Sequence, residues 1–319
     1  MSMKKIGILF GRENTFPQAF IDKVNELAAG KDIVAEAVKI DKVAQGEPSG
    51  YDLIVDRISQ DVPFYRAFLK NAALSGTIVV NNPFWWSADE KFFNNALATK
   101  IGIHVPKTVI LPSYEWPDDT NGESFRNLAY PLDWDGIFDY VGFPAYMKPF
   151  AGGGWKNVYK LHDKAEFYEK HQETNQLVMM LQEEVIFTEY YRCYCVGGKY
   201  VHIMPYEPRN PHHLRYSADF SPSLEMKKIL EDAVLKINQY LGYELNTVEL
   251  AVRDEIPYAI DFCNPAPDAD LKSVGQENFD WIVNTMAKYV IERVEAAKPN
   301  TDNLLWGKFV TSAVNGKSL

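Results

Sequence analysis

The sequence of residues 143–158 is Phe-Pro-Ala-Tyr-Met-Lys-Pro-Phe-Ala-Gly-Gly-Gly-Trp-Lys-Asn-Val. A short apolar segment, Ala145–Met147, leads into Lys148, and strand-like alternation returns at residues 157–161. This order predicts a strand, a glycine-rich loop and a second strand. Because glycine tolerates positive φ and lets the backbone approach a ligand closely, the N–H groups of such a loop form a concavity that suits phosphate oxygens. Lys148 can add a positive charge beneath those oxygens.

The same segment also fits a flexible hairpin turn beside an ordinary surface lysine, because glycine runs are common in loops. Two other phosphate-binding motifs are excluded. The segment lacks the Gly-x-x-x-x-Gly-Lys-Ser/Thr pattern, and no helix follows its glycines as the dinucleotide-binding fingerprint requires. The choice between a phosphate site and a plain turn therefore depends on the rest of the chain.

Length and composition indicate a globular protein of two domains, since the chain has 319 residues, 46% hydrophobic and 24% charged. The net charge of -10 argues against nucleic acid or an anionic membrane as a main partner. The N-terminus has no apolar signal segment, and no run of about 18 apolar residues occurs.

Three cysteines do not make a disulfide framework, so we expect a cytoplasmic protein. Cys193 and Cys195 share one face of a predicted strand, which favours two core residues over a redox pair.

The first part of the chain alternates predicted strands, at residues 4–10, 33–40, 51–58 and 77–80, with predicted helices. This pattern predicts a parallel sheet with helices on both faces, whose ligands bind beyond the carboxyl ends of the strands. Arg12 and Arg57 lie at such ends and are candidates for substrate contact. A solvated or ion-paired Arg57 is nearly as well supported.

From Phe143 onward, hairpins and helices replace this alternation, so the second part of the chain is α+β. Gly197-Gly198 is a two-residue hairpin signal.

Lys91 lies in the first turn of a predicted helix at residues 88–100. The helix dipole does not favour lysine at this position, which points to a functional use. Residues 112–139 form a long acidic, tryptophan-containing insertion with little periodicity, and we expect a lid or a subunit contact.

A second predicted hairpin, of residues 245–252 and 258–264, brings two carboxylates together. With a three-residue loop at residues 254–256, Glu249 lies opposite Asp261. Facing carboxylates repel unless a cation lies between them, and Mg²⁺ typically binds one or two carboxylates with substrate phosphates. Arg192 is an alternative counter-charge, and a solvated polar face is also open.

These segments, in this order, resemble the ATP-grasp ligases, especially the branch of glutathione synthetase, D-alanine–D-alanine ligase and the ribosomal-protein glutamate ligase. The resemblance covers most of the chain. It implies that Lys91 and Lys148 bind phosphates, that residues 151–155 form a small lid, that the hinge after residue 181 contacts adenine, and that Arg192 faces the reacting phosphates. The implied ATP-binding residues are Lys91, Lys148, Gly152, Gly153, Gly154, Gln182, Glu183, Glu184, Val185 and, for the ribose, Glu189.

The resemblance also implies a magnesium hairpin of Glu249, Asp261 and Asn264, with Mn²⁺ as an alternative ion. The family pattern usually ends in Glu-x-Asn, whereas Asp261-Phe-Cys-Asn264 is one residue longer. A β-bulge at Phe262–Cys263 would return Asn264 to the metal face. Without it, Asn264 lies off the site and one metal is held less well.

The implied fold is an N-terminal parallel α/β domain (1–85) followed by an ATP-grasp fold of two α+β subdomains (86–180 and 181–319). The implied activity is ATP-dependent carboxylate–amine ligation through an acyl phosphate, with Lys148 and Arg192 as catalytic residues. The substrates are expected to be small amino acids or peptides, and a homodimer is the family expectation. An ATP-binding regulatory module without turnover and a carboxylate–thiol ligase are the alternatives. The candidates for substrate contact are Arg12, Arg57, Arg209 and Arg215.

Overall fold

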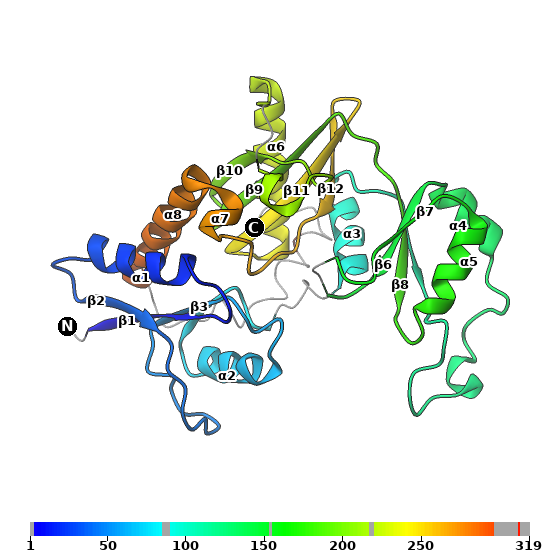
Figure 1. Cartoon of the computed structure of the whole chain (residues 1–319). Coiled ribbons are helices and arrows are strands. Elements are labelled where there is room, and N and C mark those ends of the chain that lie inside the picture. Colours follow the sequence, from blue (N-terminus) through cyan, green and yellow to red (C-terminus); the bar gives the residue numbers. More distant parts are fainter. Residues whose placement is uncertain (1–2, 85–89, 153–154, 217–219, 297–311, 313–319) are drawn as a thin grey trace. The chain divides into compact units, whose positions relative to one another are not determined.

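The computed structural model of the chain describes residues 3–84, 90–152, 155–216, 220–296 and 312 (Figure 1). The chain divides into two compact units: unit 1 combines residues 1–86 with residues 188–319, and unit 2 consists of residues 87–187. The expected boundaries after residues 85 and 180 lie close to these crossing points, and the three-domain division remains a prediction. None of the helices in the described part of the chain is long and apolar enough to span a membrane.

Unit 1 begins with sheet A, whose four strands all run parallel. Residues 53–55 are completely buried and apolar, as expected for a parallel sheet covered on both faces. One face packs on α1 (Phe16–Leu27) and α8 (Gln276–Glu295), and the other packs on α2 (Pro63–Leu74), as Figure 1 shows. The predicted sheet with helices on both faces is confirmed. The strands, in their spatial order, are β2 (Ile33–Ala37), β1 (Lys4–Leu9), β3 (Leu53–Asp56) and β4 (Ile78–Val80).

The second sheet of unit 1, sheet C, is antiparallel. Its first hairpin turns at residues 197–199, because Val196 pairs with Tyr200, so the turn is one residue longer than the two-residue turn predicted from the sequence. Gly197 and Gly198 have φ angles of 62° and 63°. Tyr194 and Val196 project from one face into the core that α8 and sheet A share. Helix α6 (Leu224–Leu241) also packs on this sheet. The strands, in their spatial order, are β10 (Tyr200–Pro205), β9 (Glu189–Val196), β11 (Leu245–Arg253) and β12 (Ile256–Asp261), and the short helices are η3 (His212–Leu214) and α7 (Leu271–Val274).

Unit 2 contains an antiparallel sheet, sheet B, and the helix α3 (Lys91–Lys100). In β6 (Ala145–Pro149), Ala145 and Met147 join a core formed with α4 (Trp134–Val141) and α5 (Lys164–Glu173). Because successive strand residues alternate, Tyr146 and Lys148 belong to the other face of the sheet. The other strands are β5 (Thr108–Leu111), β8 (Met179–Glu183) and β7 (Tyr159–Leu161), in the order β5-β8-β6-β7.

The insertion at residues 112–139 contains more regular structure than its sequence suggested. It includes the short helix η2 (Gly122–Phe125) and the beginning of α4, where the Asp133 side chain accepts a hydrogen bond from a backbone N–H at 3.0 Å. Trp134 and Phe138, one helical turn apart, both pack on Phe167 of α5. The expectation of an aperiodic segment was wrong here, because a short apolar repeat within an acidic loop becomes a helix once α5 covers it.

Cys193 and Cys195 are buried in sheet C, as predicted for core residues. Burial raises the pKa of both thiols, to about 12 for Cys195. Neither side chain is therefore a thiolate at neutral pH, and a reactive cysteine needs the thiolate form.

Gly197→Ala is expected to lower the free energy of unfolding more than Gly198→Ala. Both positions have positive φ, which costs a residue with a Cβ about 1–2 kcal/mol. At Gly197 the new Cβ would also overlap the Tyr289 ring, whereas at Gly198 it meets open space. Urea unfolding of the two variants measures the difference. Equal losses would show that Tyr289 does not constrain the turn.

Candidate functional site

Three charged side chains form a row across sheet C. Glu249 on β11 lies directly opposite Arg192 on β9 and, on its other side, directly opposite Asp261 on β12. Residues directly opposite in antiparallel strands project from the same face. The side chains of Arg192 and Glu249 are 12% and 16% exposed, and Arg192 Nε lies 3.6 Å from Glu249 Oε1. The structure therefore contains the carboxylate pair that the sequence predicted, with Arg192 beside it.

The pairing of Glu249 with Asp261 depends on a β-bulge. The turn between β11 and β12 has two residues, 254 and 255, with φ of 52° and 61°, where the sequence analysis expected three. Such a turn alone would set Glu249 opposite Ile260. The register shifts at this point, so that Ile260 is the extra residue and Asp261 faces Glu249. The bulge thus precedes Asp261 and does not lie at residues 262–263.

Asn264 is tied to β11 beside the row. Its backbone N–H donates to Oδ1 of Asn246 at 2.8 Å, and its own Nδ2 donates to the carbonyl of Thr247 at 3.2 Å. Thr247 precedes Glu249 by two residues and shares its face of the strand. These bonds accommodate the extra residue after β12 and hold Asn264 against the strand that carries Glu249.

Three tyrosines that the sequence analysis did not select surround the row. Tyr190 donates to Glu249 Oε2 at 2.6 Å, and Tyr216 accepts from Arg192 Nη1 at 2.8 Å. The Tyr206 ring lies 5.5 Å from the guanidinium carbon of Arg192. Burial, with the negative charge of Glu249, raises the pKa of Tyr190 well above its ordinary value, so Tyr190 stays a donor. Strand spacing could have indicated Tyr190, but only the fold brings Tyr206 and Tyr216 to the row.

In unit 2 the two predicted phosphate-binding lysines lie on neighbouring elements. Lys148 is near the end of β6, on the face opposite the core with α4 and α5. Lys91 is the first residue of α3, and its backbone N–H donates to the carbonyl of Phe150 at 2.8 Å. This bond places the first turn of α3 beside the end of β6. Gly152 follows with a φ of 88°, which requires glycine, whereas Gly153 and Gly154 lie outside the described residues.

The predicted adenine-binding residues lie at the end of β8 and in the segment after it. Gln182 is buried and donates through Nε2 to β5 at 2.8 Å. The Glu183 N–H donates to the segment before β5 at 2.9 Å. Glu184 accepts from Lys160 of β7 at 2.7 Å, and this hydrogen bond raises the pKa of Lys160. With Val185 buried as well, the segment is held in place by its bonds to β5 and β7.

Glu189, the predicted ribose ligand, begins β9 in unit 1. Its carboxylate accepts a hydrogen bond from the Tyr191 hydroxyl. Because strand residues alternate, this pair belongs to the face opposite Arg192. Contact between Glu189 and a nucleotide stays a prediction.

Arg57 is buried and ion-paired, which is the alternative that the sequence left open. Its guanidinium donates to both carboxylate oxygens of Glu13 and to the carbonyl of Pro267, the latter at 2.7 Å. The guanidinium carbon lies 4.8 Å from the centre of the Phe16 ring. Direct contact between Arg57 and a substrate would require Glu13 to move.

The other candidate arginines lie in more open surroundings. Arg12 is exposed in the loop after β1. Arg209 donates through Nε and Nη2 to the carboxylate of Glu207, two residues before it. Arg215 donates to the Tyr206 hydroxyl at 3.4 Å, and the Tyr206 ring also faces Arg192. Of these candidates, Arg215 is thus connected to the row through a shared tyrosine.

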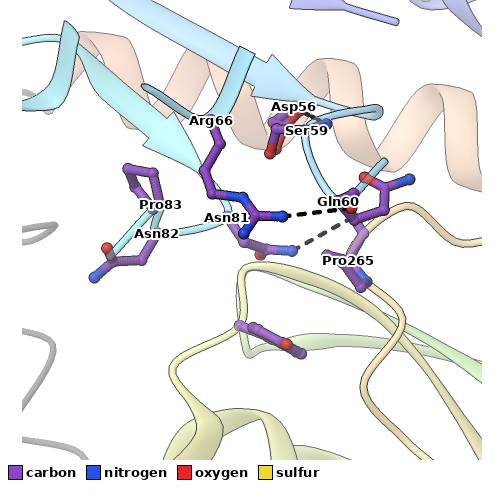
Figure 2. A pocket seen from close by; sticks show the side chains of 9 residues that line it. Asp56, Ser59, Gln60, Arg66, Asn81, Asn82, Pro83 and Pro265 are labelled. Atoms are coloured by element: carbon purple, nitrogen blue, oxygen red, sulfur yellow. Dashed lines mark hydrogen bonds between the residues drawn. The ribbon is translucent and has the colours of Figure 1, made fainter. Parts of the chain in front are cut away.

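A polar cavity of about 20 Å³ lies at the carboxyl edge of sheet A (Figure 2). Asp56, at the end of β3, accepts the N–H groups of Ile58 and Ser59 at 3.1 and 3.0 Å. Asn81, after β4, donates to the carbonyl of Leu245 at 2.7 Å. The cavity has room for about one water molecule. Because Asp56 and Asn81 are both bonded to the chain itself, the cavity belongs to the junction between sheets A and C.

Comparisons with known proteins agree with this architecture. No protein-family model and no curated protein matches the chain. Among solved structures, a RimK domain ATP-grasp protein from Sphaerobacter thermophilus has a TM-score of 0.63 at 16% identity, covering 90% of this chain and 99% of that one. D-alanine–D-alanine ligase from Bacillus anthracis, complexed with ATP, has a TM-score of 0.59 at 20% identity, with 92% and 97% covered. ATP-grasp ligase PsnB, complexed with a minimal precursor, Mg and ADP, has a TM-score of 0.59 at 15% identity, with 91% and 97% covered.

The chain has the ATP-grasp fold. The predicted fold class is confirmed, since a parallel N-terminal sheet is followed by two antiparallel sheets with helices. At identities of 15–20% the likeness establishes the ATP-grasp fold and not a substrate.

Within this ATP-grasp fold, the two carboxylates of the row are ligands of the kind that Mg²⁺ takes. The carboxylates of Glu249 and Asp261 face each other, an arrangement that favours a bound cation. Mg²⁺ commonly takes one or two protein carboxylates and completes its shell with phosphate oxygens and water. Asn264 would add a neutral oxygen. The described residues contain no cluster of three or more His, Cys, Asp or Glu that would hold a metal by itself, so a nucleotide would have to supply the other ligands.

Asp261→Asn is expected to stabilise the protein without metal or nucleotide by about 0.2–1 kcal/mol, because it removes a like-charged cross-strand pair. The same variant should lose the extra stabilisation that Mg²⁺ with ADP gives the wild type, since a ligand stabilises only the state that binds it. Thermal unfolding with and without Mg²⁺ and ADP measures both effects. A variant that Mg²⁺ and ADP still stabilise as much as the wild type would contradict the metal assignment.

Proposed function

We propose that the chain is an ATP-dependent ligase that joins a carboxylate to an amine and forms ADP and phosphate. One observation carries the proposal: within an ATP-grasp fold, Glu249 pairs in register with Arg192 on one side and with Asp261 on the other. A cation and two carboxylates in one row on a sheet face suit a magnesium nucleotide.

Phosphoryl transfer needs stabilised charge on the transferring group more than it needs a covalent catalyst. Lys91 and Lys148 neutralise the ATP phosphates, and Arg192 faces the phosphate that is transferred. Mg²⁺, or Mn²⁺ in its place, held by Glu249, Asp261 and Asn264, would supply further neutralisation of the phosphate oxygens.

Other residues, most of them in unit 2, bind the remainder of the nucleotide. The segment Gln182–Val185 contacts adenine, and its hydrogen bonds to β5 and β7 keep it ordered before ATP arrives. Gly152, with Gly153 and Gly154, covers the phosphates, and Glu189 contacts the ribose. Preordered contacts of this kind lower the entropic cost of binding.

The reaction proceeds in two steps that need no protein nucleophile. In the first, a carboxylate oxygen of the substrate bonds to the γ-phosphorus, the bond from that phosphorus to the bridging oxygen breaks, and ADP leaves. In the second, the amine attacks the carbonyl carbon of the acyl phosphate, phosphate leaves, and the amine loses a proton. The buried thiols of Cys193 and Cys195 are consistent with this route, because neither can act as a nucleophile.

The substrates are amino acids or peptides. Solved structures with this fold include D-alanine–D-alanine ligase, VanG D-Ala:D-Ser ligase and macrocyclase MdnC bound with precursor peptide MdnA. Arg12, Arg209 and Arg215 supply positive charge for an anionic substrate, and Arg57 would contribute only if it were released from Glu13.

The test of function is ADP release measured across pairs of amino acids and short peptides. Release that rises only when a suitable carboxylate and amine are both present is the expected result, and Asp261→Asn should abolish it. ATP binding without release for any pair would favour the ATP-binding regulatory module. Release that rises with a thiol such as coenzyme A, and not with amines, would favour the carboxylate–thiol ligase.

Lys148→Ala is expected to lower affinity for a non-hydrolysable ATP analogue by about 10- to 100-fold, the value of one charge-assisted hydrogen bond. Isothermal titration calorimetry measures the loss. The matched control is Lys164→Ala, because Lys164 is an exposed lysine of unit 2 that pairs with Asp135. Wild-type affinity in the Lys148 variant would remove this lysine from the site.

We also propose that the insertion at residues 112–139 forms the subunit contact of a homodimer. Tyr114, Trp116 and Tyr130 are exposed by 50%, 57% and 97%, and aromatic residues are enriched at interfaces. Deleting residues 118–127 should change the assembly size in sedimentation experiments and leave ATP affinity as it is. An unchanged assembly with an altered substrate KM would indicate a lid instead.

A further inference from the structure

The two opposite charges at the centre of the row form a loose salt bridge without a hydrogen bond at Arg192 Nε. Arg192 Nε lies 3.6 Å from Glu249 Oε1, whereas a charge-assisted hydrogen bond of this type measures about 2.7–2.9 Å. Nε of Arg192 is buried and has no hydrogen-bond partner among the described residues. Attraction between opposite charges is strong where water is excluded, so other contacts must hold these two groups apart.

Two tyrosine hydroxyls provide these contacts. Tyr190 lies two residues before Arg192 on the same face of β9, diagonal to Glu249, and donates to Glu249 Oε2 at 2.6 Å. Tyr216 comes from the segment after η3 and accepts from Arg192 Nη1 at 2.8 Å. The ring of Tyr206 lies 5.9 Å from the Tyr190 ring and 5.0 Å from the Tyr216 ring, so it fills the space between them. Each charged group is therefore held by its own hydroxyl.

Unit 1 contains a second cluster of a tyrosine, a glutamate and an arginine, in which the hydrogen bonds are arranged differently. Arg293 donates through Nε to Glu244 Oε1 at 2.9 Å, and the Tyr289 hydroxyl donates to that same oxygen. The side chains of Arg293 and Glu244 are 22% and 21% exposed, similar to those in the row. Here the arginine and the glutamate form a hydrogen-bonded ion pair, and the tyrosine and the arginine share one carboxylate oxygen. In the row, Tyr190 donates to Glu249 Oε2, the oxygen farther from Arg192 Nε, and Tyr216 accepts from the guanidinium of Arg192.

We propose that Tyr190 and Tyr216 are positioning residues that keep Glu249 and Arg192 from closing into a hydrogen-bonded ion pair. In the proposed ligase, on which this role depends, Glu249 is thereby directed to the divalent cation and Arg192 to the phosphate. A phenolic hydroxyl suits this task because it holds a charged group by a hydrogen bond without neutralising it.

The experiment measures the dissociation constant of Mn²⁺ by electron paramagnetic resonance in the presence of saturating ADP. Tyr190→Phe should weaken Mn²⁺ binding about tenfold, the usual loss when a hydrogen bond to a metal ligand is removed. Arg192→Met alone is measured as the reference for the double variant. The double variant Tyr190→Phe/Arg192→Met should regain most of the lost affinity, because no guanidinium is left to capture Glu249. Tyr289→Phe, which alters the second cluster, is the matched control and should bind Mn²⁺ like the wild type.

The outcomes separate this role from the proposed function. A wild-type protein that does not bind Mn²⁺ with ADP would refute the nucleotide site itself. Normal Mn²⁺ affinity in Tyr190→Phe would overturn the positioning role while leaving the nucleotide site in place. A double variant as weak as Tyr190→Phe would also overturn it, because Tyr190 would then act only through the packing of the sheet. If Tyr190→Phe does not fold, Tyr216→Phe tests the same idea, since releasing Arg192 toward Glu249 should weaken Mn²⁺ binding as well.

Discussion

The register between β11 and β12 is the constraint on which the candidate site depends. The two-residue turn at 254–255 and the bulged Ile260 together set Asp261 opposite Glu249. Because side chains alternate along a strand, the same turn without the bulge would move Asp261 to the other face of the sheet. Arg192 would then have one carboxylate beside it, and a divalent cation would have only one protein ligand on β11 and β12. One extra residue thus decides whether sheet C can hold a metal.

The start of β11 is held in turn by sheet A. Asn81 accepts the N–H groups of Glu244 and Leu245 at 2.7 and 2.8 Å, and its own amide donates to the Leu245 carbonyl at 2.7 Å. A buried side-chain amide can satisfy several backbone groups at once, and leaving such groups unsatisfied costs about 1–3 kcal/mol each. A continuous core joins α1, α8 and both sheets of unit 1. The row is therefore built on a strand that two layers of structure fix, which favours a preorganised site.

Unit 2 uses the alternation of strand residues to separate its core from its charged groups. Ala145 and Met147 pack under α4 and α5, whereas Tyr146 and Lys148 lie on the other face with Lys160 and Gln182 in register beside Tyr146. The lysine ammonium of Lys160 lies 6.0 Å from the Tyr146 ring, and it also pairs with Glu184. One face of sheet B stabilises the unit, and the other carries the groups proposed to bind the nucleotide. The backbone bond from Lys91 to Phe150 adds the first turn of α3 to the end of β6.

The features that could be predicted from the sequence are those that depend on neighbouring residues. Apolar runs predicted the parallel strands, Gly197-Gly198 predicted the hairpin turn, and alternation placed Glu249 and Asp261 on one face. A three-residue loop sets Glu249 opposite Asp261, and so does a two-residue turn followed by a one-residue bulge. The pair was therefore predicted correctly although the predicted loop length was wrong. The helix α4 was missed because its short apolar repeat becomes helical only against Phe167.

Tertiary structure alone decided the rest, because it depends on contacts between distant parts of the chain. Arg57 is closed off by Glu13 and by the carbonyl of Pro267, 210 residues away, and no local pattern predicts that contact. The approach of Tyr206 and Tyr216 to Arg192 likewise requires the hairpin and the segment after it to fold together. The sequence thus specified which charged groups the molecule has and on which face of each strand they lie. Packing between residues far apart in the sequence determined which of those charges close into hydrogen-bonded ion pairs and which do not.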